Sequence, residues 1–319
     1  MKRKVVKQGP ATFMISMPSK WVKKYNVQKG DEIDLEEDGS NLVIIRENKQ
    51  RKKKAIIDLD NFNTMILNRH FAEFYRQGIE EIEIRFDKPT FPDYKNNREI
   101  EIDRYVKKTI ERFIGMEIIS NTKNKIIIQS FITHEKFEKI EVVQKRIYFL
   151  IKEFMEELVK AMDADFNSFN QRSYDYHDNI VKFLYYYLRL MKFSDVEEEK
   201  KERLFSLFMI IDKAIDKIRH TSEKVNEMKK ITPKIKVYVQ KNFLFFLDQF
   251  EMIQRADYTV KDLNLLIRKR YDIINMIKKE KFNEEEIKVI GECKFMTDTT
   301  NDFIETYAAL KMEKYVSEL

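Results

Sequence analysis

The chain has 319 residues, of which 43% are hydrophobic; this is enough to build packed cores in two or three domains, and the lack of a run of about 18 uncharged apolar residues excludes a membrane-spanning helix. The net charge is +6, but the excess lies entirely in residues 1–54, where 14 Lys and Arg stand against 7 Asp and Glu, whereas residues 55–319 carry 46 against 47. Residues 1–30 hold eight basic residues and no acid, which indicates a module that binds nucleic-acid phosphates rather than an ordinary soluble surface, where both signs would be mixed.

Residues 1–46 alternate in the manner of short strands, in the order strand, strand, helical turn, strand, strand. The expected elements are strands at Val5-Val6 and Phe13–Met17, a helix over Lys20–Tyr25 that Pro18-Ser19 opens, and strands over Glu32–Glu36 and Leu42–Ile45 around an Asp38-Gly39 turn. So short a unit cannot bury enough surface alone, and we expect it to need a partner. The basic run Lys49–Lys54 is either a solvated linker or a further contact to the DNA backbone, and its composition favours neither.

Residues 55–134 change to a mixture of strands and helices. The expected elements are a strand at Ile56-Ile57, a helix capped by Asp60-Asn61 and ended by Gly78, a strand over Ile79–Phe86, a helix from Asp103 to Gly115, and a hairpin of Met116–Ser120 with Ile126–Phe131. This segment contains no phosphate-loop glycines and no catalytic cluster. We interpret it as a spacer or an interface.

From Glu135 onwards the apolar spacing is helical throughout. The expected helices cover residues 135–170, 172–193, 197–228, 233–255, 258–281 and 284–316. Six helices in two sets of three suggest two tandem three-helix bundles, although the spacing also allows another all-α packing. The N-terminus has no apolar signal segment and Cys293 is the only cysteine, so we expect a cytoplasmic protein without a disulfide.

The first segment resembles the AbrB/MazE swapped-hairpin family. The residues that carry the resemblance are Lys7-Gln8-Gly9, Ala11-Thr12, Ile15 to Lys20, Tyr25 to Val27, and Lys29 to Ile33. The resemblance implies that two chains interleave their hairpins into one β-barrel, giving a homodimer that binds double-stranded DNA. The residues expected to face DNA are Arg3, Lys4, Lys7, Thr12, Lys20, Lys23 and Lys24.

The rest of the chain resembles the archaeal form of the PhoU family of phosphate-uptake regulators, through Phe113–Ile119, Ile127–Gln129, Asp175–Asp178 and Tyr185–Arg189. That family often carries paired acids four residues apart on its helices, associated with clusters of transition metals such as Fe or Zn. The candidate ligands are Asp175, Asp178, Asp212, Asp216, Asp298 and Asp302. The alternative is that these acids form a solvated helix edge, because two carboxylates at this spacing repel weakly unless a cation lies between them.

These patterns together predict a multidomain, mainly α protein. Its expected segments are an AbrB-like DNA-binding and dimerisation domain (1–48), a basic linker (49–54), a small α/β domain (55–134) and a PhoU-like six-helix domain (135–319). No Glu-x-x-His, nucleotide-binding loop or hydrolase motif is present, so we do not expect an enzyme.

Two functions remain open from the sequence. In the first, the chain is a DNA-binding transcriptional regulator of phosphate homeostasis, with the helices as sensor or partner-binding module. In the second, it is an interaction protein that regulates a phosphate transporter or signalling kinase by contact. The acid-free first 30 residues favour the first function, because dimerisation alone gives no reason for eight cations.

Overall fold

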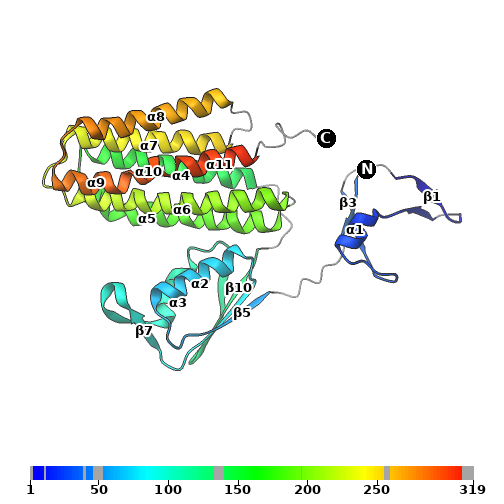
Figure 1. Cartoon of the computed structure of the whole chain (residues 1–319). Coiled ribbons are helices and arrows are strands. Elements are labelled where there is room, and N and C mark those ends of the chain that lie inside the picture. The colour runs from blue at the N-terminus through cyan, green and yellow to red at the C-terminus, as the bar shows by residue number, and fades with distance from the viewer. Residues whose placement is uncertain are drawn as a thin grey trace. The chain divides into compact units, whose positions relative to one another are not determined.

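The computed structural model describes residues 3–10, 12–38, 41–45, 53–132, 140–194, 196–254 and 259–310. The chain divides into two compact units, Met1–Lys52 and Lys53–Leu319, and each is described by itself (Figure 1). We call the first unit the head and the second the body. Among the described residues no helix is long and apolar enough to cross a membrane.

The head has the predicted order of elements. These are β1 (Val5–Lys7), β2 (Phe13–Ile15), α1 (Ser19–Lys24), β3 (Asp34–Asp38) and β4 (Asn41–Ile45). β1 pairs with β2 and β3 with β4, both antiparallel. The helix begins one residue earlier than predicted, with Pro18 in extended conformation at the N-cap position and no side-chain cap.

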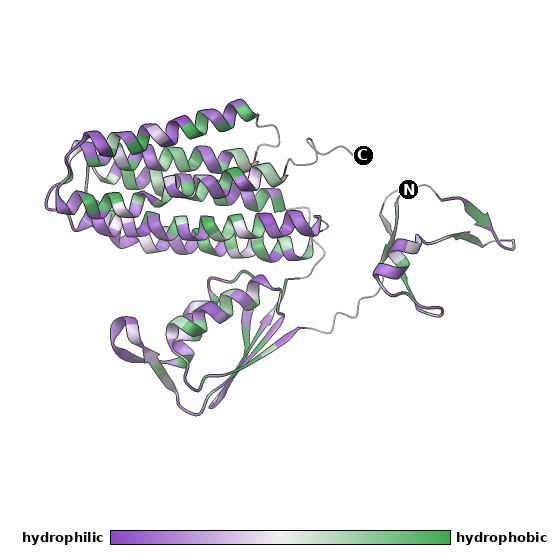
Figure 2. Ribbon diagram, in the orientation of Figure 1, coloured by the Kyte–Doolittle hydropathy of each residue, from purple (hydrophilic) through white to green (hydrophobic). Residues whose placement is uncertain are grey.

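The two hairpins of the head form separate two-stranded sheets, and none of the described head residues is buried. Hydrophobic residues run along the strands without cover from this chain (Figure 2). Phe13, for example, leaves 66% of its surface exposed. A single head therefore has no hydrophobic core among its described residues.

The α/β domain (residues 53–132) is built on a four-stranded sheet in the order β5-β6-β10-β9, in which β5 and β6 run parallel and the other neighbours antiparallel. Its elements are β5 (Lys54–Asp58), α2 (Thr64–Arg76), β6 (Glu81–Arg85), β7 (Thr90–Asp93), the 3-10 turn η1 (Tyr94–Asn96), β8 (Arg98–Glu101), α3 (Ile102–Ile110), β9 (Met116–Thr122) and β10 (Lys125–Ser130). The chain passes from β5 through α2 to β6, the helical crossover that parallel neighbours require. Ile82 and Ile128 pair across the sheet and are buried, so one sheet face forms part of the core.

The opposite face of the sheet carries a charged network. Lys54, expected in the linker, is the first residue of β5, and its Nζ lies 3.1 Å from Glu81 and 2.6 Å from Glu83. Arg85 reaches the other oxygen of Glu83 at 2.7 Å. The hydrogen bonds from Lys54 and Arg85 lower the pKa of Glu83 to about 2.

Three details of the α/β domain differ from the sequence prediction. α2 is capped by Asn63, whose side chain accepts hydrogen bonds from two backbone N–H groups of the first turn, and not by Asp60-Asn61. α3 starts after Glu101, so Asp103 lies in its first turn and does not cap the helix. Its negative charge there interacts favourably with the positive end of the helix dipole. The β7–β8 hairpin was not predicted, because its strands have four residues each and Pro92 interrupts the strand pattern.

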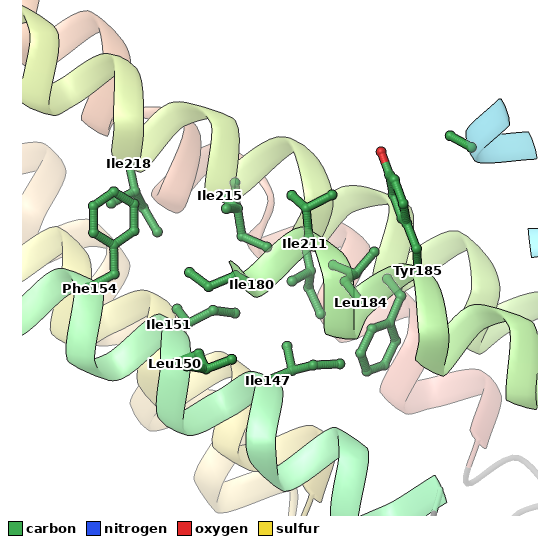
Figure 3. Close-up of a cluster of buried hydrophobic side chains, with 14 of the residues drawn as sticks. Ile147, Leu150, Ile151, Phe154, Ile180, Leu184, Tyr185, Ile211, Ile215 and Ile218 are labelled. Carbon is green, nitrogen blue, oxygen red and sulfur yellow. The ribbon is translucent and has the colours of Figure 1, made fainter. Parts of the chain in front are cut away.

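The helical part (residues 140–310) contains eight helices within the described ranges (Figure 1). They are α4 (Ile140–Ala161), α5 (Phe166–Phe193), α6 (Glu198–Asn226), α7 (Pro233–Gln254), α8 (Val260–Lys279), α9 (Glu284–Cys293), α10 (Phe295–Asp298) and α11 (Thr300–Leu310). α5 packs against α4 and α6, and their apolar side chains meet in a common core (Figure 3). The second set packs onto the first, α7 on α4 and both α9 and α11 on α6.

Two predicted helices were too long. The first break falls at residues 162–165 and not at 171, because Asp165 caps α5 by accepting a hydrogen bond from the N–H of Ser168. The predicted helix over 284–316 is interrupted at Lys294 and Thr299; its residues 311–316 and residues 135–139 of the first predicted helix lie outside the described ranges. Threonine hydroxyls in this stretch, such as that of Thr300, donate to carbonyls three residues earlier and so compete with the helical pattern.

A buried arginine joins the two parts of the body. Arg189 of α5 donates from Nη1 to the carbonyls of Tyr75 (2.9 Å) and Ile79 (3.2 Å) and from Nη2 to the hydroxyl of Ser130 (3.1 Å). Close by, Gly78 has φ +79° and ends α2 as predicted, and a Cβ there would lie 2.2 Å from the ring of Phe193. The α/β domain is therefore fitted closely against α5.

Candidate nucleic-acid interface

The predicted DNA-facing residues are all exposed and lie on two neighbouring parts of the head sequence. Thr12 and the six cations occupy the first hairpin with the residues before it, and helix α1. None of the six cationic side chains forms an ion pair with a described residue. Their charges are therefore available to a ligand.

Helix α1 presents three lysines on one side. Lys20, Lys23 and Lys24 are separated by three and four residues, which places them on one helix face, and all three are exposed. Trp21 contacts Tyr25 at 5.1 Å between ring centroids, and both rings belong to this short segment. Lys23 and Lys24 also lie in the last turn, where a positive charge interacts favourably with the negative end of the helix dipole.

The first hairpin carries the remaining candidates. Lys7 ends β1 opposite Phe13, and Arg3 and Lys4 precede the strand. The N–H of Gln8 donates to the carbonyl of Thr12 at 2.8 Å, which closes the turn and places Thr12 at the start of β2. The head therefore carries a basic hairpin that is followed in sequence by a basic helix, and positive side chains of this kind suit contact with phosphate oxygens.

The predicted metal residues lie at separate places in the body. Asp175 is exposed on α5, and Asp298 and Asp302 are exposed and fall in two different helices, α10 and α11. Asp298 lies 3.8 Å from the Nζ of Lys294. The break before Thr300 removes the continuous helix that the pairing of Asp298 with Asp302 assumed.

Asp178 and Asp216 flank a histidine that the sequence prediction left out. His177 directs Nδ1 to Asp178 and Nε2 to Asp216, each at 2.9 Å. Although burial disfavours the charged ring, these two hydrogen bonds raise the pKa of His177. Both ring nitrogens face carboxylates, which is the arrangement that the doubly protonated imidazolium satisfies.

Asp178 has one further partner, and Asp212 is buried nearby on α6. Asp178 also accepts a hydrogen bond from Arg112 of the α/β domain at 2.8 Å. Asp212 is 4% exposed, and burial together with the charge of Asp216 raises its pKa. In the described part of the chain no three His, Cys, Asp or Glu side chains gather in a way that would hold a metal ion. The residues present do not fit the metal cluster that the resemblance implies, so the expectation of Fe or Zn rests on the sequence pattern alone.

The comparisons with known proteins match the head and the first two residues of the body. The family model described as antidote-toxin recognition MazE, bacterial antitoxin, matches residues 6–54. No curated protein and no solved structure matches the chain. A MazE/AbrB-type domain indicates DNA binding, whereas the resemblance of the body to the PhoU family stays a prediction from sequence.

Proposed function

We propose that this protein is a transcriptional regulator that binds double-stranded DNA through its head. The observation that carries the proposal is the set of six exposed cations on α1 and on the first hairpin with the residues before it, none of which forms an ion pair with a described residue. The family match over residues 6–54 supports it independently. We propose no catalytic activity.

The head acts as a dimer in this proposal. Large apolar residues on both faces of the first hairpin, and on β3 and β4, are exposed in one chain; they are Val5, Val6, Phe13, Met14, Ile15, Leu35 and Leu42. Leaving such side chains in water costs roughly 1.5–3 kcal/mol each relative to full burial. A second copy that interleaves its hairpins covers them and forms the barrel that the head lacks alone.

The body serves as the sensor or partner-binding module. Its link to phosphate homeostasis rests on the sequence resemblance described above. The alternative function is an interaction protein that does not bind DNA and regulates a phosphate transporter or kinase by contact. The exposed cations favour DNA, because its phosphate backbone presents negative charge along its whole length.

Binding of the full chain to genomic DNA fragments at several salt concentrations tests the proposal. Each neutralised phosphate contributes a slope of about −0.9 in log affinity against log salt. The triple variant Lys4→Ala, Lys7→Ala and Lys23→Ala should flatten this slope by up to about five units if a dimer presents each lysine twice.

The matched control is Lys145→Ala, Lys241→Ala and Lys288→Ala, three exposed body lysines without an ion pair among described residues. This control should leave the slope unchanged. Equal slopes in the parent and in the head variant would refute the head as the DNA-binding surface. Absence of any salt-dependent DNA binding by the folded parent would favour the interaction protein instead.

A further inference from the structure

The α/β domain contains an open groove of about 750 Å³ that no sequence motif indicates. Its walls include the loops Leu59–Phe62 and Phe86–Lys88, which follow the carboxyl ends of β5 and β6. Because β5 and β6 are parallel, these ends lie at the same edge of the sheet. Small molecules bind in pockets of about 300–1,000 Å³, and in parallel sheets they often bind at this edge.

Four aromatic side chains line the groove. Phe86 and Phe91 are buried beneath it, Phe62 is half-buried, and Tyr94 is 74% exposed at η1. Tyr94 and Phe62 therefore leave aromatic surface open to a ligand. Aromatic faces attract cations, most strongly where water is partly excluded.

The charged residues of the groove are mostly acidic. Asp60, Asp87 and Glu99 line it, against a single basic residue, Lys88. None of these four side chains forms an ion pair or a hydrogen bond with a described residue. Other acids of the same domain do have such partners, as Asp93 has with Arg98. The groove therefore holds carboxylates that nothing in the described chain neutralises.

An anionic ligand is the alternative, because α2 begins beside the groove and a helix N-terminus favours negative charge. The N–H groups of Met65 and Ile66 in its first turn already donate to the side chain of Asn63, at 2.9 and 3.1 Å. Three carboxylates against one ammonium outweigh the remaining partial charge of the helix end, which is about half a unit. The electrostatics therefore favour a cation.

We propose that this groove binds a small organic cation, an ammonium compound with an apolar body. The carboxylates recognise its charge, and the aromatic wall contacts its alkyl or aromatic part. The inference does not depend on DNA binding, since the groove lies entirely in the body. It assigns the α/β domain a ligand-binding role instead of that of a spacer.

The test compares two probes of the same shape, choline and its neutral isostere 3,3-dimethyl-1-butanol, by calorimetric titration of the full chain. Choline should bind roughly five- to tenfold more tightly, from the attraction of its charge to aromatic rings and carboxylates. The variant Asp60→Asn, Asp87→Asn and Glu99→Gln should lose most of the preference for choline, because only the aromatic rings still attract its charge. The control Glu111→Gln with Glu117→Gln, which changes two exposed acids of the same domain outside the groove lining, should bind as the parent does.

Melting curves establish that each variant is folded, and Asp87→Asn alone serves if the triple variant is not. The single change should reduce the preference for choline without removing it. Equal affinity of the parent for both probes, or no heat from either probe at concentrations up to about 50 mM, the weak end for so small a ligand, would overturn the proposal. Unchanged choline affinity in the folded triple variant would overturn it as well.

Discussion

Replacing Arg189 by Met tests how firmly the α/β domain is held against the helical part. Arg189 is buried and makes three hydrogen bonds, to the carbonyls of Tyr75 and Ile79 and to the hydroxyl of Ser130. Methionine keeps much of the side-chain volume but offers no donor. The change therefore removes the bonds with a limited loss of packing.

The size of the effect follows from what each acceptor retains. The carbonyl of Tyr75 still accepts the N–H of Gly78 at 3.0 Å, and the hydroxyl of Ser130 still accepts the N–H of Ile132 at 3.4 Å. The main loss therefore falls on the carbonyl of Ile79. A hydrogen bond to a charged group contributes about 1.5–3 kcal/mol, and removing a buried charge regains part of its desolvation cost. We expect the free energy of unfolding to fall by about 2–4 kcal/mol.

Urea unfolding followed by circular dichroism measures this loss, and the melting temperature should fall by roughly 5–15 °C. Arg203→Met, at an exposed position of α6, is the matched control and should change stability by no more than about 0.5 kcal/mol. Hydrogen exchange should show faster opening of α2 and β10 than of α9. A loss below about 0.5 kcal/mol for Arg189→Met would refute the reasoning that this residue joins the two parts.

Three further predictions follow from the exposed apolar residues, the charged sheet face and the buried thiol. Light scattering should give the full chain a mass twice 38.7 kDa; Phe13→Asp should reduce it to one chain, and Ile287→Asp, at a similarly exposed site of the body, should not. The pKa of Glu83 lies at about 2 in the folded state, below the pKa of this group in the unfolded chain, so its contribution to stability is present above the unfolded pKa and is lost as the pH falls towards 2. Glu83→Gln should therefore flatten the acidic part of the curve of unfolding free energy against pH. An unchanged curve in this variant would contradict the prediction. Burial raises the pKa of the Cys293 thiol to about 12, so a thiol reagent at pH 8 should react at the rate of unfolding, and immediate labelling of the native protein would show that the site is open.

Much of the fold could be predicted because its elements follow local rules. The helices of the body repeat apolar residues at helical spacing, and the strands of the head alternate between short turn signals. The boundaries were less predictable where side chains compete with the backbone. Asp165 begins a new helix within a polar stretch. The threonines around Thr299 interrupt what the apolar spacing had predicted as one continuous helix.

The candidate sites were predictable only as far as they are local. The three lysines of α1 lie on one helix face because of their spacing, so the sequence alone predicts that they lie together. His177 is next to Asp178 in sequence, but its hydrogen bond with Asp216 joins two helices, α5 and α6. No local sequence pattern indicates a contact of that kind. The groove of the α/β domain is likewise formed by loops distant in sequence, including the β7–β8 hairpin that the pattern did not reveal.

The place of β5 in the sheet has a mechanical consequence. β5 is both an edge strand and the first element of the body, and its five residues pair in parallel with β6. A force that pulls the amino end of β5 along the strand axis loads all of the β5–β6 hydrogen bonds at once, in shear. A force perpendicular to the strand opens the same hydrogen bonds one after another. Lys54, at the loaded end, is anchored to both Glu81 and Glu83. The first strand of the body therefore resists tension best along its own axis.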